Sequence, residues 1–152
     1  MNLIIMRHGQ SGWSAPSDAE RFLSDEGKAE VKDVAQKVSA WGQVSSVIAS
    51  PYLRAQQTGI LVADIIGCAI DTADVLVPEG KLQEVVSHVS MLLEHEDCLL
   101  LASHMPLVSK LTGWLCEGVI NEGPIFDTAN AAILELDSMG AGTARLVKMV
   151  LP

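Results

Sequence analysis

The stretch Asn2-Leu3-Ile4-Ile5-Met6-Arg7-His8-Gly9 decides how the rest of the sequence is interpreted. Its first part, Asn2–Met6, is a short apolar run, which predicts a buried β-strand beginning almost at the first residue. Arg7, His8 and Gly9 follow at once, where this strand should end. In parallel sheets covered by helices, reactive groups lie just beyond the carboxyl ends of the strands. The tripeptide therefore stands where a functional site is expected.

Outward from this strand, apolar segments alternate with amphipathic helices through about residue 117. Ser24 is the expected N-cap of a helix that ends at Gly42, and Ser50 and Pro51 suit the cap and first turn of the next. The other expected elements are strands at Val44–Ala49, Leu99–Ala102 and, more weakly, Ile70–Val77, helices at residues 52–66, 82–93 and 107–116, and closing strands at Ala131–Leu136 and Ala144–Val150. Such alternation predicts one α/β domain over residues 1–152, with three layers (α/β/α) around a mostly parallel central sheet.

The composition excludes several classes of protein. With 152 residues, 49% hydrophobic and 19% charged, the chain can fill a core and is not a disordered sequence. A net charge of −9 argues against nucleic acid or an anionic membrane as partner. No apolar run approaches the ~20 residues of a membrane-spanning helix, so we expect a soluble, cytoplasmic protein. The three cysteines form no CxxC pair and are interpreted as reduced thiols.

Rare cations gather at the ends of the predicted strands. Of only four arginines in the sequence, Arg7 and Arg54 fall in segments that follow predicted strands, and Arg21 lies in the loop after the first strand. His8 and His104 occupy strand ends as well. Such a cluster repels itself unless an anion neutralises it, and phosphoryl oxygens match the guanidinium fork. The sequence has no P-loop and no carboxylates at metal-ligand spacing, so we expect neither a metal nor another cofactor.

Four segments in order resemble the histidine phosphatase superfamily. They are Arg7-His8-Gly9, Arg21-Phe22-Leu23-Ser24-x-x-Gly27, Ser50-Pro51-x-x-Arg54-Ala55-x-Gln57-Thr58 and Ser103-His104-x-Pro106. The short length and the second segment are closer to its small SixA-type phosphohistidine phosphatases. The resemblance implies a phosphoglycerate mutase-like fold in a minimal form without large insertions.

The resemblance also implies roles for individual residues. His8 would be the nucleophile that accepts the phosphoryl group, while Arg7, Arg54 and His104 would hold its oxygens. Arg21 and the backbone N–H of Met105 would be further phosphate contacts. A nucleophilic imidazole must be neutral, and neighbouring arginines lower its pKa. Arg21 has an alternative interpretation, a simple ion pair with Asp18 or Glu20.

The general acid of the larger superfamily members has no clear counterpart in this sequence. Glu79, in the turn Val77–Lys81, is the tentative candidate, with a solvated turn residue as the alternative. A site without a dedicated acid favours phosphohistidine, whose imidazole leaves readily once protonated, over an alcohol leaving group. We therefore expect a metal-independent phosphatase with a phosphorylated signalling or phosphotransfer protein as partner. The alternatives are a phosphomonoesterase for small molecules and an inactive phosphate-binding module, and the sequence gives no oligomeric state.

Overall fold

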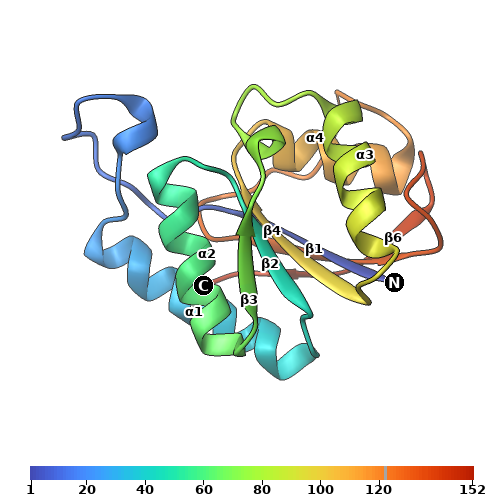
Figure 1. Cartoon of the computed structure of the whole chain (residues 1–152), viewed down its shortest axis with the longest axis horizontal. Coiled ribbons are helices and arrows are strands. Elements are labelled where there is room, and N and C mark those ends of the chain that lie inside the picture. The colour runs from blue at the N-terminus through green and yellow to red at the C-terminus, as the bar shows by residue number, and fades with distance from the viewer. Residues whose placement is uncertain (122) are drawn as a thin grey trace.

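A six-stranded sheet in the order β3-β2-β4-β1-β5-β6 runs through the middle of the molecule (Figure 1). The computed structural model describes residues 1–121 and 123–152. The strands are β1 (Asn2–Arg7), β2 (Ser46–Ala49), β3 (Ala69–Thr72), β4 (Cys98–Ser103), β5 (Ala131–Leu136) and β6 (Ala144–Val150). The helices are α1 (Asp25–Trp41), α2 (Leu53–Ile66), α3 (Leu82–Leu93) and α4 (Leu107–Glu117), with short 3-10 turns η1 (Asp18–Glu20) and η2 (Asp74–Leu76).

The central pair of strands places the segments that carry His8 and His104 side by side. β1 and β4 are parallel, with Arg7 opposite Ser103, and the His8 N–H donates to the Ser103 carbonyl at 2.9 Å. His8 and His104 therefore leave the same edge of the sheet together. β2 and β3 are also parallel, whereas β5 and β6 are antiparallel, as expected for closing strands joined by a short Gly-rich turn. The expected mostly parallel α/β/α architecture is confirmed.

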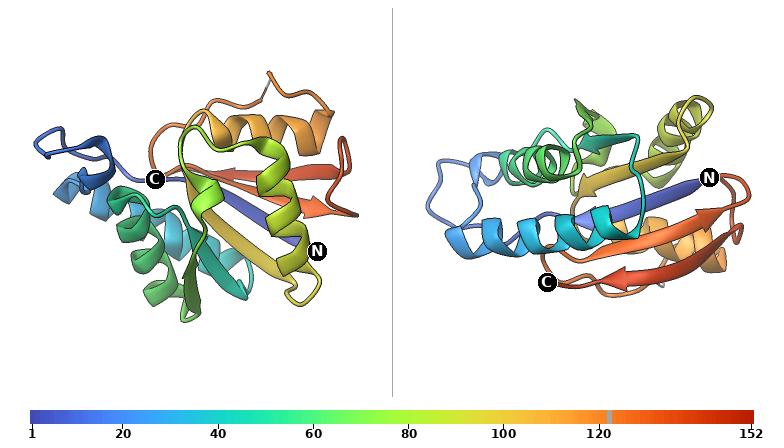
Figure 2. Two further views of the ribbon diagram at one scale, coloured as in Figure 1. Left: turned by 45° about the horizontal axis from the view of Figure 1, so that its top comes forward. Right: turned by 90° about the horizontal axis from the view of Figure 1, so that it is seen from below.

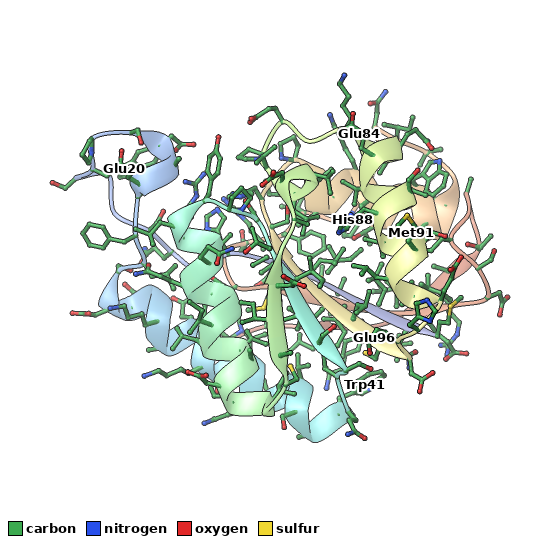
Figure 3. The ribbon with its side chains drawn as sticks, viewed as in Figure 1. Glu20, Trp41, Glu84, His88, Met91 and Glu96 are labelled. Atoms are coloured by element: carbon green, nitrogen blue, oxygen red, sulfur yellow. The ribbon has the colours of Figure 1, made fainter. Side chains whose placement is uncertain are left out.

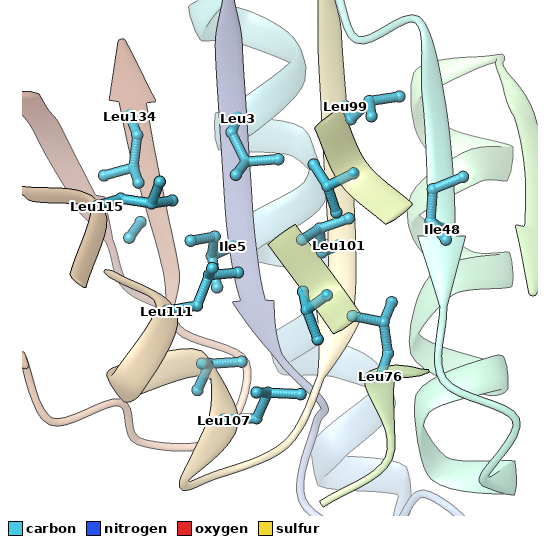
Figure 4. Packing of buried hydrophobic residues seen from close by; sticks show 14 of the residues in the cluster. Leu3, Ile5, Ile48, Leu76, Leu99, Leu101, Leu107, Leu111, Leu115 and Leu134 are labelled. Carbon is cyan, nitrogen blue, oxygen red and sulfur yellow. The ribbon is translucent and has the colours of Figure 1, made fainter. Parts of the chain in front are cut away.

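Two hydrophobic clusters hold the helices against the two faces of the sheet. Because side chains alternate along a strand, Leu3 and Ile5 of β1 face α3 and α4, while Ile4 and Met6 face α1 and α2. Figure 1 shows these helix pairs on either side of the sheet, and Figure 4 shows the leucine-rich packing on the α3–α4 face. The core thereby fixes the sheet edge on which the site is built.

The loop between β1 and α1 is anchored at its two ends and projects between them (Figure 2). Ser24 caps α1 by accepting the Gly27 N–H at 3.0 Å, as expected. A Cβ added to Gly27 would lie 2.2 Å from the Gln10 carbonyl oxygen, and one added to Gly9 would lie 2.7 Å from a Val31 methyl. The backbone after His8 can pack this closely on α1 only because both positions are glycine.

The structure corrects two boundaries expected from the sequence. Ser50 does not cap α2, because Tyr52 is the N-cap residue and the Ser50 hydroxyl accepts its N–H at 3.3 Å. The strand expected over Ile70–Val77 ends at Thr72, after which the chain turns through η2 to bury Leu76.

Two further expectations from the sequence concern cysteines and membrane spans. The cysteines are free thiols, and burial raises the pKa of Cys98 to about 11. In residues 1–121 and 123–152, no helix has the length and apolarity needed to cross a membrane.

Candidate active site

His8 follows β1 directly and is held at both ring nitrogens. It is 6% exposed. Its Nδ1 lies 2.7 Å from the Gly9 carbonyl oxygen, which can only accept, so Nδ1 carries the proton. Its Nε2 lies 3.2 Å from the Nε–H of Arg54, which can only donate, so Nε2 presents a lone pair. The backbone therefore fixes the tautomer in which Nε2 is the free nucleophile.

The electrostatic environment keeps this imidazole neutral. Burial lowers the pKa of His8 to about 4, opposed by the hydrogen bond to Gly9 and assisted by the charges of Arg54, Arg7 and Arg21. At neutral pH the ring is therefore unprotonated at Nε2, as nucleophilic attack requires.

Arg54 projects from the first turn of α2 and is 4% exposed. Besides the His8 contact, its Nη1 donates to the Asp18 backbone carbonyl at 2.6 Å and its Nη2 to the Asp18 carboxylate at 3.2 Å. Thr58 connects this turn to the nucleophile loop, since its hydroxyl accepts the Gly9 N–H at 3.0 Å and donates to the Arg54 carbonyl at 2.8 Å. A cation at a helix N-terminus is unfavourable by itself, which is consistent with a site for anions.

Arg7 and His104 each keep a buried nitrogen without a hydrogen-bond partner among the residues described. Arg7 Nη1 donates to the Phe126 carbonyl at 2.9 Å, while its Nε is unpartnered. Burial lowers the pKa of Arg7, although the nearby Asp127 charge opposes this. The His104 ring lies 5.1 Å from the His8 ring, centroid to centroid, and its Nδ1 is unpartnered. Buried polar atoms are rarely left unpaired, so these two nitrogens are candidates for contacts with a bound ligand.

Ser50 contacts one ring nitrogen of His104. Its hydroxyl oxygen lies 2.8 Å from His104 Nε2 and already accepts the Tyr52 N–H. A hydroxyl oxygen can accept two hydrogen bonds, so Ser50 can either accept from Nε2 or donate to it; when it donates, the proton of the neutral ring lies on Nδ1. Burial, helped by the cationic neighbours, lowers the pKa of His104 to about 3 and keeps the ring neutral. With the Ser50 hydroxyl as donor, His104 offers an N–H at Nδ1, the unpartnered position.

Arg21 lies in the projecting loop and pairs with Asp18, the residue that Arg54 also contacts. Its Nη1 pairs with the Asp18 carboxylate at 3.0 Å, its Nε donates to the Gly12 carbonyl at 2.9 Å, and its guanidinium stacks 3.6 Å from the Trp13 ring centroid. Trp13, Ala15, Pro16, Ser17, Asp18 and Arg21 line a cavity of about 290 Å³. The structure therefore brings Arg21 to Asp18, and through Asp18 to Arg54.

The arrangement is one neutral imidazole with a lone pair on Nε2, surrounded by N–H groups from four chain segments. Such a site matches a tetrahedral oxyanion, whose oxygens accept several charge-assisted hydrogen bonds at once. Within the described part of the chain, no three His, Cys, Asp or Glu side chains gather as a set of metal ligands. The arrangement can hold a phosphoryl group beside a ring nitrogen of His8 that carries a lone pair.

Comparison with known proteins identifies the family. Residues 3–77 match the histidine phosphatase superfamily (branch 1). The chain is 34% identical over 151 residues to the phosphohistidine phosphatase SixA of Escherichia coli (strain K12), which covers 94% of this chain and 90% of that protein. The chain belongs to the histidine phosphatase superfamily.

Other members of this superfamily agree with the assignment. A SixA homolog of Haemophilus influenzae is 28% identical over 126 residues, covering 76% of this chain and 77% of that protein. The solved structure of the protein histidine phosphatase SixA complexed with tungstate superposes with a TM-score of 0.91 at 31% identity, covering 100% of this chain and 97% of that one. This chain is therefore a histidine phosphatase of the SixA type.

Two residues expected from the superfamily resemblance, Met105 and Glu79, take no part in the hydrogen bonds around His8 described above. The Met105 N–H, directly after His104, forms no hydrogen bond within the described residues and is free to donate. Glu79 is exposed and lines a separate cavity of about 460 Å³ with Pro106 and Lys110. No hydrogen bond or ion pair among the described residues connects Glu79 with His8.

Sequence reasoning did not assign three contributors to this histidine phosphatase site. Thr58 and Ser50 stand inside the quoted motifs, so their place in the family pattern was the available signal. Asp18 entered only as an alternative partner for Arg21, and the structure shows that it also holds Arg54. A loop without periodicity carries no signal for that second contact.

Proposed function

We propose that this chain is a phosphohistidine phosphatase that removes the phosphoryl group from a histidine of a partner protein, through a covalent intermediate on His8. The observation that carries this proposal is the fixed tautomer of His8, whose unprotonated Nε2 faces the Nε–H of Arg54. The names of the similar SixA proteins support the substrate, and the tungstate in the SixA structure is a tetrahedral oxyanion of the kind this pocket suits.

In the first step, His8 Nε2 attacks phosphorus in line with the leaving nitrogen. The Nε2–P bond forms while the P–N bond of the substrate breaks, and the electron pair of that bond stays on the departing ring. A substrate ring that is protonated on its other nitrogen leaves as neutral imidazole, so no proton donor is needed. Arg7, Arg54 and the Nδ1–H of His104 hold the phosphoryl oxygens, with Arg21 and the Met105 N–H as further contacts.

In the second step, water attacks phosphorus and the Nε2–P bond breaks, returning its electron pair to His8. Both hydrogens of the water remain with the released dihydrogen phosphate. The phosphorylated ring keeps its proton on Nδ1, which donates to the Gly9 carbonyl oxygen. The ring is therefore cationic and is a good leaving group. The same hydrogen bond thus selects the nucleophilic tautomer and prepares the intermediate for hydrolysis.

Among residues 1–121 and 123–152 no carboxylate forms a hydrogen bond with His8, which favours a phosphoramidate over a phosphate monoester. An alcohol leaving group requires a proton, and a positioned acid contributes roughly 10²–10⁴-fold to the rate. Glu79 is the candidate for the acid in the sequence, and its exposed side chain lines a separate cavity, so its assignment as the acid is still a proposal. A monoesterase acting on a small metabolite is the competing activity, and substrate ranking separates the two.

The experiment compares turnover of a phosphohistidine protein with turnover of sugar phosphates. We expect a higher kcat/KM for the phosphohistidine protein, and equal or better turnover of sugar phosphates would reject this substrate. An acid-labile, alkali-stable phosphoenzyme should be trapped on the wild-type chain and lost in His8→Ala. His95→Ala, at an exposed histidine, is the matched control and should keep the label. A label that survives His8→Ala would reject the nucleophile.

A further inference from the structure

Asp18 connects the two arginines that approach the nucleophile from the loop side and from α2. Its Oδ1 accepts from Arg21 Nη1 at 3.0 Å and its Oδ2 accepts from Arg54 Nη2 at 3.2 Å. Its backbone carbonyl also accepts from Arg54 Nη1 at 2.6 Å. The Nε–H of Arg54 in turn donates to His8 Nε2. The Arg54 guanidinium therefore connects the Asp18 carboxylate with the proposed nucleophile.

This carboxylate has capacity for another hydrogen bond. The Asp18 side chain is 56% exposed, and each oxygen has one arginine partner among the described residues although it can accept two hydrogen bonds. The hydrogen bond from Arg21 and the charge of Arg54 lower the pKa of Asp18, so it is an acceptor and not an acid near neutral pH. It lies on the three-residue turn η1 and lines the cavity beside Trp13.

The leaving group of the proposed reaction supplies the matching donor. A phosphohistidine ring that leaves as neutral imidazole carries an N–H on the nitrogen that is not bonded to phosphorus. This N–H points away from the phosphoryl group and therefore away from His8. A phosphate monoester has no such donor, and the negative charge that develops on its leaving oxygen is repelled by a carboxylate at the same place.

We propose that Asp18 is a specificity-determining residue, whose carboxylate accepts the distal N–H of the substrate imidazole and so favours phosphohistidine over phosphate monoesters. This role rests on the proposed function. As the P–N bond breaks, its electrons neutralise the cationic ring, and the proton stays on the distal nitrogen in its hydrogen bond to Asp18. Hydrogen bonds to charged groups are among the stronger ones in proteins, so we expect this contact to contribute about 10- to 100-fold to kcat/KM for phosphohistidine.

The test is the ratio of kcat/KM for a phosphohistidine peptide to kcat/KM for p-nitrophenyl phosphate. In Asp18→Asn we expect this ratio to fall at least about 10-fold, and Asp18→Glu should restore part of it. Glu20→Gln is the matched control. It removes the same charge from the same turn (Figure 3), where Glu20 pairs with Ser17 and not with an arginine, and it should leave the ratio unchanged.

A second measurement is the pH profile with the phosphohistidine peptide. Activity falls as the distal nitrogen of the substrate loses its proton, and without the Asp18 carboxylate this fall should move to lower pH. A structural role that merely orients Arg21 and Arg54 would not move it.

Four outcomes would overturn the proposal in different ways. Equal losses on both substrates in Asp18→Asn would mean that Asp18 only positions the arginines. Gains on both substrates would mean that the carboxylate only blocks the phosphate pocket. A wild-type chain without preference for phosphohistidine would reject the proposed function and this role with it, whereas a preference that Asp18→Asn leaves unchanged would reject this role alone.

Discussion

The Nε atom of Arg54 lies 3.2 Å from the Nε2 atom of His8, although the two residues are 46 positions apart. The guanidinium is always protonated, so the imidazole nitrogen facing it must hold a lone pair. One contact therefore places a permanent positive charge beside the attacking atom and excludes a proton from it. That combination attracts a phosphoryl group while the nucleophile stays reactive.

Replacing Arg54 by lysine should nearly abolish turnover. A lysine ammonium is a single point charge and cannot contact His8 and both acceptors of Asp18 at once. We expect kcat to fall about 10²- to 10³-fold, the loss typical for an essential donor to a transition state. Arg145→Lys is the control, because Arg145 forms only an exposed pair with Glu135. An Arg54→Lys chain that keeps wild-type kcat would contradict the role of the guanidinium.

The imidazole of His8 should stay neutral well into the acid range. Its pKa is lowered to about 4, chiefly by burial, so the reactive form predominates above that pH and is lost as the pH falls through it. Arg54 contributes to the lowering, so Arg54→Gln should move the titration of His8 towards higher pH. NMR titration of the ring, assigned with His8→Asn, measures this. A wild-type ring that titrates near 6.5 would refute the expectation.

Removing the Ser50 hydroxyl should impair His104 without disturbing the fold elsewhere. In Ser50→Ala the Nε2 of His104 loses its hydrogen-bond partner, and with it the contact that holds the ring in one tautomer and orientation. We expect kcat/KM to fall about 10-fold. Ser103→Ala is a matched control at a buried serine of β4, whose hydroxyl donates to the Leu76 carbonyl and not to a histidine. Equal losses in activity per folded molecule would argue against the tautomer explanation.

A methyl group at Gly27 should displace the backbone that follows His8. The added Cβ would lie 2.2 Å from the Gln10 carbonyl oxygen, which belongs to the main chain and cannot rotate away. We expect Gly27→Ala to lower the free energy of unfolding by about 1–3 kcal/mol and to reduce kcat as well. Gly42→Ala has no atom within 4 Å of its new Cβ and should do neither. Urea denaturation and turnover are the measurements, and an unperturbed Gly27→Ala would disprove the close packing.

Turnover should be insensitive to EDTA. In the proposed reaction the arginines and His104 neutralise the phosphoryl oxygens, which is the part that magnesium plays in many phosphoryl-transfer sites. Assays with and without chelator, on one enzyme preparation, measure this. Loss of activity that a divalent cation restores would require a different mechanism.

The sequence was most informative where the chain follows a buried strand. Apolar runs located β1 and β4, and their parallel pairing had to bring His8 and His104 to one edge, so the contact between distant residues followed from topology. The helix starting near residue 52 was also evident, but its cap was not. Ser50 has a side chain typical of caps, yet its hydroxyl is used by His104, a partner that only the fold brings near.

The projecting loop was the least predictable part of the site. Between Gln10 and Leu23 the sequence has no periodicity that would orient a side chain, so Asp18 and Glu20 looked equivalent as partners for Arg21. The structure separates them, because Asp18 contacts both arginines and Glu20 contacts Ser17. Such a distinction depends on tertiary contacts with α2, which local sequence does not encode.

The amide of His8 is hydrogen-bonded to β4 at the centre of the sheet, whereas Asp18 lies on an exposed turn. Central strands open only when the whole molecule unfolds, while loops open through small local fluctuations. Backbone hydrogen exchange should therefore be slow at the attacking residue and fast at the turn that carries the carboxylate. The molecule combines an immobile reaction centre with an adaptable rim, so a partner protein can be accommodated without displacing the atoms that carry out the transfer.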